Sequence, residues 1–381
     1  AGSGEQETVI LKARTLMSEA QGLARAGDKP GATTRYQAAQ ELLAQVTGPG
    51  SAEGPAARAM FMMGLCAERL EANQSAIDYY QRTIRRFKAS DEYLAATLRL
   101  ANLMQKEGRD EEALRKFREV LRSVVRPDDF RNRWLTLKQF QDDILLAWSN
   151  WLDKDHYEEA LKLAEAMPPL IDSARALEFV ARTNEQWAET SEANWQKAPT
   201  TAKPPLLEEM HRRWAASGDA FGRLAVSVRT EKRYPDVVWT SALHYLNGYD
   251  FEKSLVATDE FIRTDPPTGV PPAHVHRGRV LMNLDRLPDA LSSFQFVLDN
   301  APTDPSVFEA RFRIGQCQLE SGRPDEAEST WRAILDSEEL APSANEWRMS
   351  KFALGRLLVH QASNEYRKSI PAEGAEPTEE Q

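Results

Sequence analysis

The chain has 381 residues, of which 41% are hydrophobic and 28% charged, and its formal net charge is -10. An acidic balance of this kind argues against a nucleic-acid partner, because nucleic acids attract basic faces. No stretch approaches the ~20 apolar residues that span a bilayer, so we expect no direct membrane insertion by these residues.

Pairs of small residues twelve positions apart recur along the chain. Two helices approach to about 8–10 Å only where their side chains are small, and twelve residues bridge the turn between antiparallel helices. Each pair therefore predicts one helical hairpin. The pairs are Ala20/Ala32, Gly64/Ala76, Ala101/Ala113, Ala242/Ser254, Gly278/Ala290 and Gly315/Ala327, with Trp148/Ala160 as a variant.

An aromatic residue usually follows one turn after the second small residue, where we expect it to fill the gap between neighbouring hairpins. These aromatics are Tyr36, Tyr80, Phe117, Phe294 and Trp331. Trp148 stands where the other repeats have a small residue. Its hairpin must therefore open locally, or the indole must point outward.

The middle of the chain departs from this period. Residues 172–196 and 206–230 carry two long helical patterns, separated by a proline-containing stretch at 198–205. We interpret 172–230 as one over-long hairpin at which the array bends or divides. A last helix is expected over 343–367, with a polar outer face typical of a solenoid cap. Residues 371–381 are acidic and proline-bearing, which predicts a disordered tail.

The repeated unit resembles the tetratricopeptide repeat family in its bacterial form, over most of Leu16–Leu358. The prolines that this family places after the second helix are matched by Pro266 and Pro302. The resemblance implies an all-α fold, a right-handed α-α superhelix of about eight hairpins with a C-terminal capping helix. It also implies a single solenoid over residues 1–370.

The chemistry-bearing residues do not converge in the pattern. Adjacent acids such as Glu111 and Glu112 point about 100° apart on a helix, so they form no carboxylate pair. His274 and His276 lack the i,i+4 spacing of a two-histidine zinc helix. We therefore expect no enzyme, no cofactor and no metal site.

The two cysteines each follow the small glycine of a repeat by two residues. Cys66 and Cys317 lie far apart along the expected solenoid, whereas a disulfide needs Cα atoms within about 7 Å. Both are interpreted as buried packing thiols.

Stacked hairpins place their first helices on the inner, concave side, where a protein or peptide partner could bind as an extended or helical segment. Family members that grip a terminal carboxylate have Lys where this chain has Phe61 and Leu98, so apolar anchors are expected instead. The alternative that the large side chains only pack between repeats stays open. The expected groove residues are Phe61, Leu65, Arg69, Leu98, Asn102, Lys106, Trp239, Leu243, Val275, Arg279, Phe312 and Gln316.

The sequence thus favours a non-catalytic scaffold for protein–protein interaction. One alternative is self-association through 172–230, where Trp187, Trp195 and Trp214 are candidates for exposure. Another is the structural repeat domain of a larger membrane-anchored bacterial envelope protein. The start at Ala1 resembles a processed end, so the compartment stays open between the cytoplasm and the soluble part of such an envelope protein.

Overall fold

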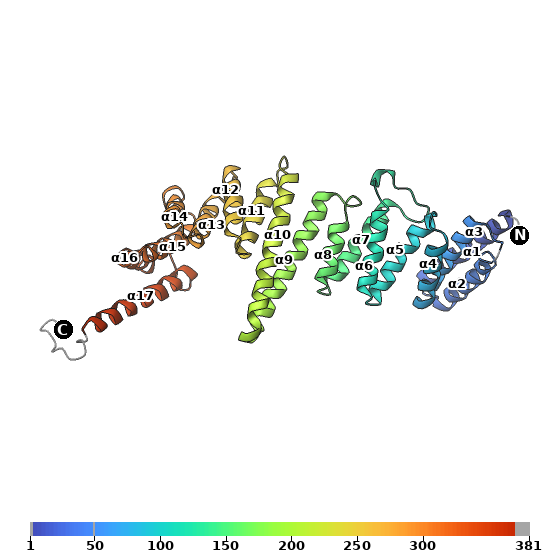
Figure 1. Ribbon diagram of the computed structural model, residues 1–381, viewed down its shortest axis with the longest axis horizontal. Coiled ribbons are helices and arrows are strands. Elements are labelled where there is room, and N and C mark those ends of the chain that lie inside the picture. The colour runs from blue at the N-terminus through green and yellow to red at the C-terminus, as the bar shows by residue number, and fades with distance from the viewer. Residues whose placement is uncertain (1–2, 49, 370–381) are drawn as a thin grey trace. The chain divides into compact units, whose positions relative to one another are not determined.

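The computed structural model describes residues 3–48 and 50–369, which contain seventeen α-helices and no strand (Figure 1). The all-α class expected from the sequence is confirmed. The chain divides at Trp187, inside the ninth helix, into two compact units. Continuity of the two units as one solenoid remains a prediction.

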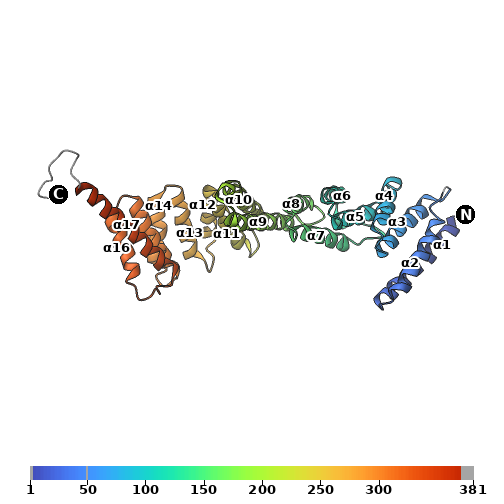
Figure 2. The same cartoon turned by 90° about the horizontal axis from the view of Figure 1, so that it is seen from below.

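The first unit consists of consecutive hairpins. Figure 2 shows its first two helices side by side as an antiparallel pair. The helices are α1 (Ser3–Arg25), α2 (Lys29–Ala44), α3 (Glu53–Arg69), α4 (Asn73–Arg86), α5 (Asp91–Lys106), α6 (Asp110–Arg122), α7 (Leu137–Leu152), α8 (Tyr157–Ala166) and the first part of α9 (Ser173–Lys197), with the short 3-10 helix η1 (Pro127–Asp129) before α7.

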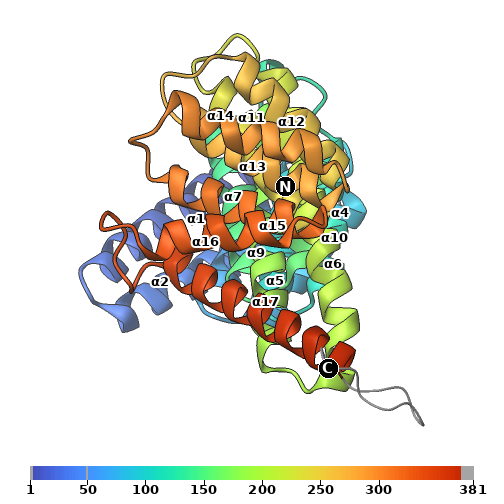
Figure 3. The same cartoon turned by 90° about the vertical axis from the view of Figure 1, so that its left-hand side faces the viewer.

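The second unit begins within α9 and repeats the hairpin plan from α11 onward. Figure 3 shows its last three helices lying next to one another. The elements are η2 (Thr200–Ala202), α10 (Lys203–Ser227), α11 (Tyr234–Asn247), α12 (Phe251–Arg263), α13 (Val270–Asn283), α14 (Leu287–Asn300), α15 (Ser306–Glu320), α16 (Pro324–Leu335) and α17 (Asn345–Ser369).

The turns of the seven repeat hairpins share one backbone conformation, a left-handed residue two positions before the second helix. Glycine adopts this conformation without steric cost, whereas other L-residues are strained by it. Four of the seven positions nevertheless carry a side chain. The residues are Gly27, Gly108 and Gly322 (φ 86°, 75° and 75°) and Glu71, Asp155, Tyr249 and Asp285 (φ 58°, 60°, 59° and 55°).

The small residues of the repeats lie at the closest approach of their two helices, as the spacing predicts, and all of them are buried. A Cβ added to Gly315 would lie 2.8 Å from Cδ1 and Cε2 of Trp331. A Cβ added to Gly64 would likewise clash with the ring of Tyr80, and one added to Gly278 with the ring of Phe294. Each ring covers the glycine of its own hairpin, sixteen residues earlier in the chain. Phe294 and Trp331 also share hydrophobic clusters with residues of the next helices, α15 and α17, in agreement with the expectation that these aromatics fill gaps between neighbouring hairpins.

Trp148 resolves the crowding of its hairpin by pointing toward the next helix. Its indole N–H donates to Oγ1 of Thr183 at 3.0 Å, and its ring lies 4.7 Å from that of Phe179. Both partners belong to α9, and Trp148 is buried. The bulky residue thus joins α7 to α9 within the first unit.

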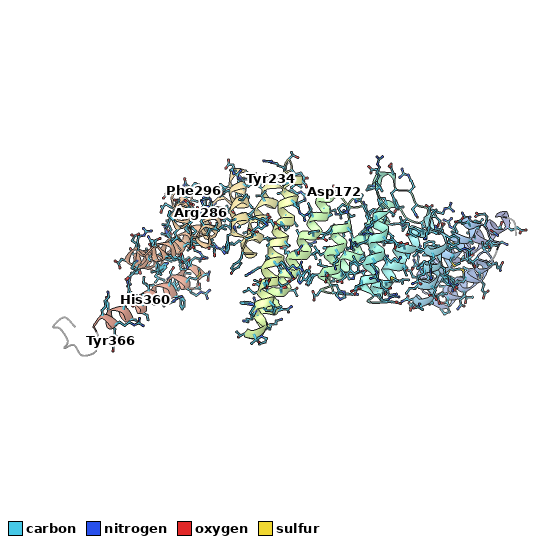
Figure 4. All side chains as sticks on the ribbon, in the orientation of Figure 1. Asp172, Tyr234, Arg286, Phe296, His360 and Tyr366 are labelled. Carbon is cyan, nitrogen blue, oxygen red and sulfur yellow. The ribbon has the colours of Figure 1, made fainter. Side chains whose placement is uncertain are left out.

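The last helix, α17, differs from the expected polar cap. Its outer face does carry the charged residues expected there, but it also exposes Phe352, Val359 and Tyr366 to 68%, 68% and 69%. Figure 1 shows the second half of α17 extending beyond α15 and α16, and Figure 4 labels His360 and Tyr366 on that part. The expected acidic tail at 371–381 lies outside the described residues.

Candidate functional site

Four of the expected groove residues are buried and cannot serve as exposed anchors. Phe61, Leu98, Val275 and Phe312 expose between 0% and 4% of their surface. A partner could touch Phe61, Leu98 and Val275 only by displacing the side chains that cover them, whereas the little exposed surface of Phe312 lines a cavity. These four side chains are packed inside the fold and not exposed in a groove. Large apolar side chains are usually buried in this way.

Phe61 is covered by the chain itself. The connection between α6 and α7, residues 123–136, reaches back to the start of α5, where Nδ2 of Asn132 donates to the carbonyl of Asp91 at 2.9 Å. The indole of Trp134 packs edge-on against Phe61 with 4.8 Å between ring centroids and donates to Oε1 of Glu92 at 2.8 Å. This position is therefore filled from within the first unit.

The other expected groove residues keep accessible surface. Arg69 and Lys106 are exposed, and Arg279 is partly exposed and lies 3.9 Å from Glu309. The remaining ones, all partly exposed, are Leu65, Asn102, Trp239, Leu243 and Gln316.

The first helices of the first unit also share a polar network that sequence reasoning missed. Glu68 accepts a hydrogen bond from the hydroxyl of Tyr80 at 2.8 Å and an ion pair from Arg99 at 3.3 Å. Burial raises the pKa of the Asp143 carboxyl on α7, and the charge of Arg99 opposes that rise. The network consists of paired groups, which is typical of helix packing rather than of a reacting centre.

A cavity that includes expected groove residues lies in the second unit, between α15 and α17. It has a volume of about 820 Å³, and two expected groove residues, Phe312 and Gln316, help to line it. The other lining residues are Leu319, Glu320, Trp331, Asn345, Arg348, Met349, Phe352, Ala353, Arg356, Leu357 and His360. We call this cavity the α15–α17 pocket.

The floor of the α15–α17 pocket is apolar because the pocket opens onto a hydrophobic cluster. Phe312 and Trp331 pack there against Leu354 and Leu357 of α17. The indole N–H of Trp331 donates to the carbonyl of Phe312 at 3.2 Å, which fixes the ring. The floor is therefore rigid and already formed, as is common for binding pockets.

The rim of the α15–α17 pocket is basic on the α17 side. Arg348 and Arg356 are exposed, and Lys351 lies between them in the sequence. None of the three forms an ion pair with a carboxylate among the residues that the structure describes. The sequence signal that was overlooked is the seven-residue spacing of Phe352, Val359 and Tyr366 on this helix.

A second cavity of about 500 Å³ lies among α10, α11 and α12. Its walls include Tyr245 and the exposed Val226 and Val256, and its rim carries both Arg229 and Glu260. It contains none of the expected groove residues. We call this cavity the reference surface.

Of the three aromatic candidates for self-association in the long hairpin, one is buried and two are half-buried. Trp214 is buried beside His244, with 4.9 Å between ring centroids. Trp187 is half-buried and stacks on Tyr157, and Trp195 is half-buried beneath the ammonium group of Lys203. The expectation that Trp214 is exposed is wrong, because it packs between helices.

The titratable groups of the second unit are used for packing. Ser254 Oγ and His276 Nε2 are 3.0 Å apart and both residues are buried. Burial lowers the pKa of His276 to about 4. His274 stacks on Phe296 at 3.8 Å, and burial lowers its pKa as well. Both imidazoles are therefore neutral at pH 7; His276 is buried and His274 is half-buried.

The two thiols are free and buried, as expected. Burial raises the pKa of Cys66 and of Cys317 to about 12. Neither is therefore a reactive thiolate at neutral pH. Over residues 3–48 and 50–369, no cluster of three or more His, Cys, Asp or Glu side chains could hold a metal ion, and no helix is long and apolar enough to cross a membrane.

A family model described as tetratricopeptide repeat matches residues 19–91 and 276–350. The search of curated proteins gives no match.

Many solved structures are similar in fold at low identity. A tetratricopeptide repeat protein from Parabacteroides merdae is 13% identical, with 81% of this chain and 99% of that chain covered and a TM-score of 0.31. The C-terminal part of a TPR repeat-containing protein from Cytophaga hutchinsonii is 12% identical, with 76% and 98% covered and a TM-score of 0.33. The APC/C hetero-tetramer Cut9–Hcn1 gives 11% identity, 91% and 90% coverage and a TM-score of 0.36. At these scores the likeness carries no argument about binding.

The family model matches both ends of the chain, and each matched segment contains hairpins closed on buried small residues. The small residue of the first helix and the aromatic of the second meet in both segments, at Gly64 with Tyr80 and at Gly315 with Trp331. The two matched segments, residues 19–91 and 276–350, are therefore tetratricopeptide repeats.

Proposed function

We propose that the chain is a non-catalytic scaffold that binds a segment of a partner protein at the α15–α17 pocket. The observation that carries this proposal is the position of the pocket. Phe312 and Gln316, which the repeat pattern assigns to a ligand groove, line a preformed apolar cavity whose rim exposes Phe352. A concave site of this kind, apolar with a few charged groups at its edge, suits the side chains of a protein segment.

The absence of a catalytic role is part of the proposal. Catalysis needs titratable groups that converge in a cleft open to substrate. His276 and Cys317, whose pKa values are strongly shifted, are instead buried in helix packing. The α15–α17 pocket is lined by two arginines, by His360 and by the carboxylate of Glu320, but by no Ser, Thr, Cys or Lys that could act as a nucleophile.

Site-specific photo-crosslinking in the source cells tests this proposal. Phe352 is replaced by p-benzoylphenylalanine, which is similar in shape, and Val256 at the reference surface is replaced in a second variant. Val256 is 65% exposed and Phe352 is 68% exposed, so the two probes differ in their position and not in their accessibility. We expect a cross-linked partner protein at position 352 and not at 256.

Two results would contradict the proposal. Equal cross-linking at both positions would show that the α15–α17 pocket has no special role. Cross-links at 352 only to another copy of this chain would favour the alternative of a self-assembling structural domain. Light scattering over a range of concentrations would then show the oligomer directly.

A further inference from the structure

The outer face of α17 carries an ordered apolar stripe rather than scattered apolar residues. Phe352, Val359 and Tyr366 follow one another at intervals of seven, and the small residues Gly355 and Ala362 lie between them at intervals of three and four. This is the a/d spacing by which one α-helix packs along another. The fifteen residues from 352 to 366 are separated by fourteen helical steps, which extend about 21 Å, or nearly four helical turns.

The stripe is continuous with the α15–α17 pocket. Phe352, the first residue of the stripe, also lines the pocket, and the exposed Leu319 of α15 lines it from the other side. An occupant that lay along α17 could therefore insert an apolar side chain into the pocket at one end. A planar lipid surface would leave such a cavity unfilled, so the shape favours a protein helix.

The charge of α17 indicates which kind of partner helix would bind to it. α17 carries five basic and two acidic side chains, in a chain whose net charge is -10. Arg348, Lys351 and Arg356 lie within about one turn of Phe352 and have no carboxylate partner among the described residues. Most other arginines of the second unit are paired, for example Arg277 with Asp259 and Arg286 with Asp289. Two copies of α17 packed together would bring basic side chains side by side, which costs binding energy.

We propose that α17 and the α15–α17 pocket bind an acidic amphipathic α-helix of a partner protein. Apolar residues of that helix, spaced by seven, pack along Phe352, Val359 and Tyr366, and one of them enters the pocket. Its flanking carboxylates pair with Arg348, Lys351 and Arg356. This inference rests on the proposed function and adds the conformation and the charge of the bound segment.

The test uses two stapled helical peptides of equal length, with leucine at the a and d positions and either Glu or Lys at the e and g positions. Their binding to the full chain is measured by fluorescence anisotropy at low and high salt. We expect the Glu peptide to bind at least about tenfold more tightly than the Lys peptide, with the difference shrinking at high salt. The double variant Arg348→Glu/Arg356→Glu is expected to reverse the preference.

A matched pair of variants locates the site. Phe352→Asp is expected to weaken the Glu peptide at least about tenfold, and Val256→Asp at the reference surface to leave it unchanged. Both residues are about two-thirds exposed, so neither change should unfold the chain, and circular dichroism checks this. Equal affinity for both peptides, no binding of either, or indifference to Phe352→Asp would each overturn the proposal.

The variant Phe352→Asp also distinguishes a partner helix from two other possible occupants of the stripe, a second copy of this chain and a lipid surface. A dimer in light scattering that Phe352→Asp makes monomeric would assign the stripe to a second copy, and flotation with anionic vesicles that this variant abolishes would assign it to a lipid surface. Either result overturns the helix proposal. If cross-linking at 352 captures a partner while both peptides fail, the scaffold function stands and only the acidic helix is wrong. If cross-linking at 352 also captures no partner protein, the proposed function fails as well.

Discussion

Gly315→Ala tests the close helix approach on which every repeat depends. The new methyl group would lie 2.8 Å from two ring atoms of Trp331, whereas carbon atoms in contact are normally about 3.5–4.0 Å apart. The ring must therefore move by about 1 Å within a fully packed cluster, which costs about 2 kcal/mol. It would also lose its 3.2 Å hydrogen bond to the carbonyl of Phe312, worth about 1 kcal/mol.

Alanine also has a favourable effect, because it is a better helix former than glycine by about 1 kcal/mol. The expected net result is that the free energy required to open α15 and α16 locally falls by about 2 kcal/mol. Gly355→Ala is the matched control: this glycine lies inside α17, where an added Cβ meets nothing within 4 Å. It should stabilise its helix by about 1 kcal/mol.

Hydrogen exchange read by mass spectrometry suits this comparison, because it gives local opening free energies and does not require the array to unfold in one step. We expect faster exchange in peptides from 306–335 for Gly315→Ala and slower exchange in α17 for Gly355→Ala. Combining Gly315→Ala with Trp331→Leu should remove the clash, so that the glycine change becomes neutral or stabilising in that background. If Gly315→Ala protects α15 as Gly355→Ala protects α17, the helices do not approach as described.

Three further outcomes are expected. Glu71→Gly should stabilise the first unit by about 0.5–1 kcal/mol in urea unfolding, because it relieves a left-handed residue at some entropic cost; a loss of stability would show that the side chain matters more than the strain. The pKa of His276 is about 4 in the folded chain and about 6.5 in the unfolded chain, so the unfolded chain binds the proton at the higher pH. The free energy of unfolding should therefore fall as the pH drops from about 6.5 to 4, by at most about 3 kcal/mol. His276→Gln should flatten that fall relative to the wild type, and an identical pH profile would refute the assignment. Trp134→Ala should cost about 2 kcal/mol and speed exchange in 123–136 while leaving α15 unaffected; unchanged exchange there would mean that the ring does not hold the connection.

Trp134 also explains why a groove inferred from the repeat pattern differs from the surface that the fold presents. The pattern assigns Phe61 and Phe312 to equivalent places in their repeats. Trp134 covers the first, and the cluster shared with α17 buries the second, yet a pocket remains open beside it. Equivalent positions therefore differ in accessibility because of segments outside the repeats.

The sequence alone determined the helical hairpins, because the spacing of small residues reports local geometry. Gly64 with Ala76 and Gly315 with Ala327 must lie where two helices meet, whatever surrounds them, and all four are buried. The burial of the two cysteines follows from the same spacing. These features depend on contacts within about forty residues, so a periodic pattern is enough to predict them.

Accessibility was decided only by the tertiary structure. Whether Phe61 is an anchor or a core residue depends on Trp134, seventy-three residues later, and whether α17 ends the array with a polar or an apolar face depends on which side packs against α15 and α16. Aromatic residues suit both a core and a binding surface, so their identity does not distinguish the two. The pattern of the chain placed the helices, and the packing between them decided which side chains remain available to a partner.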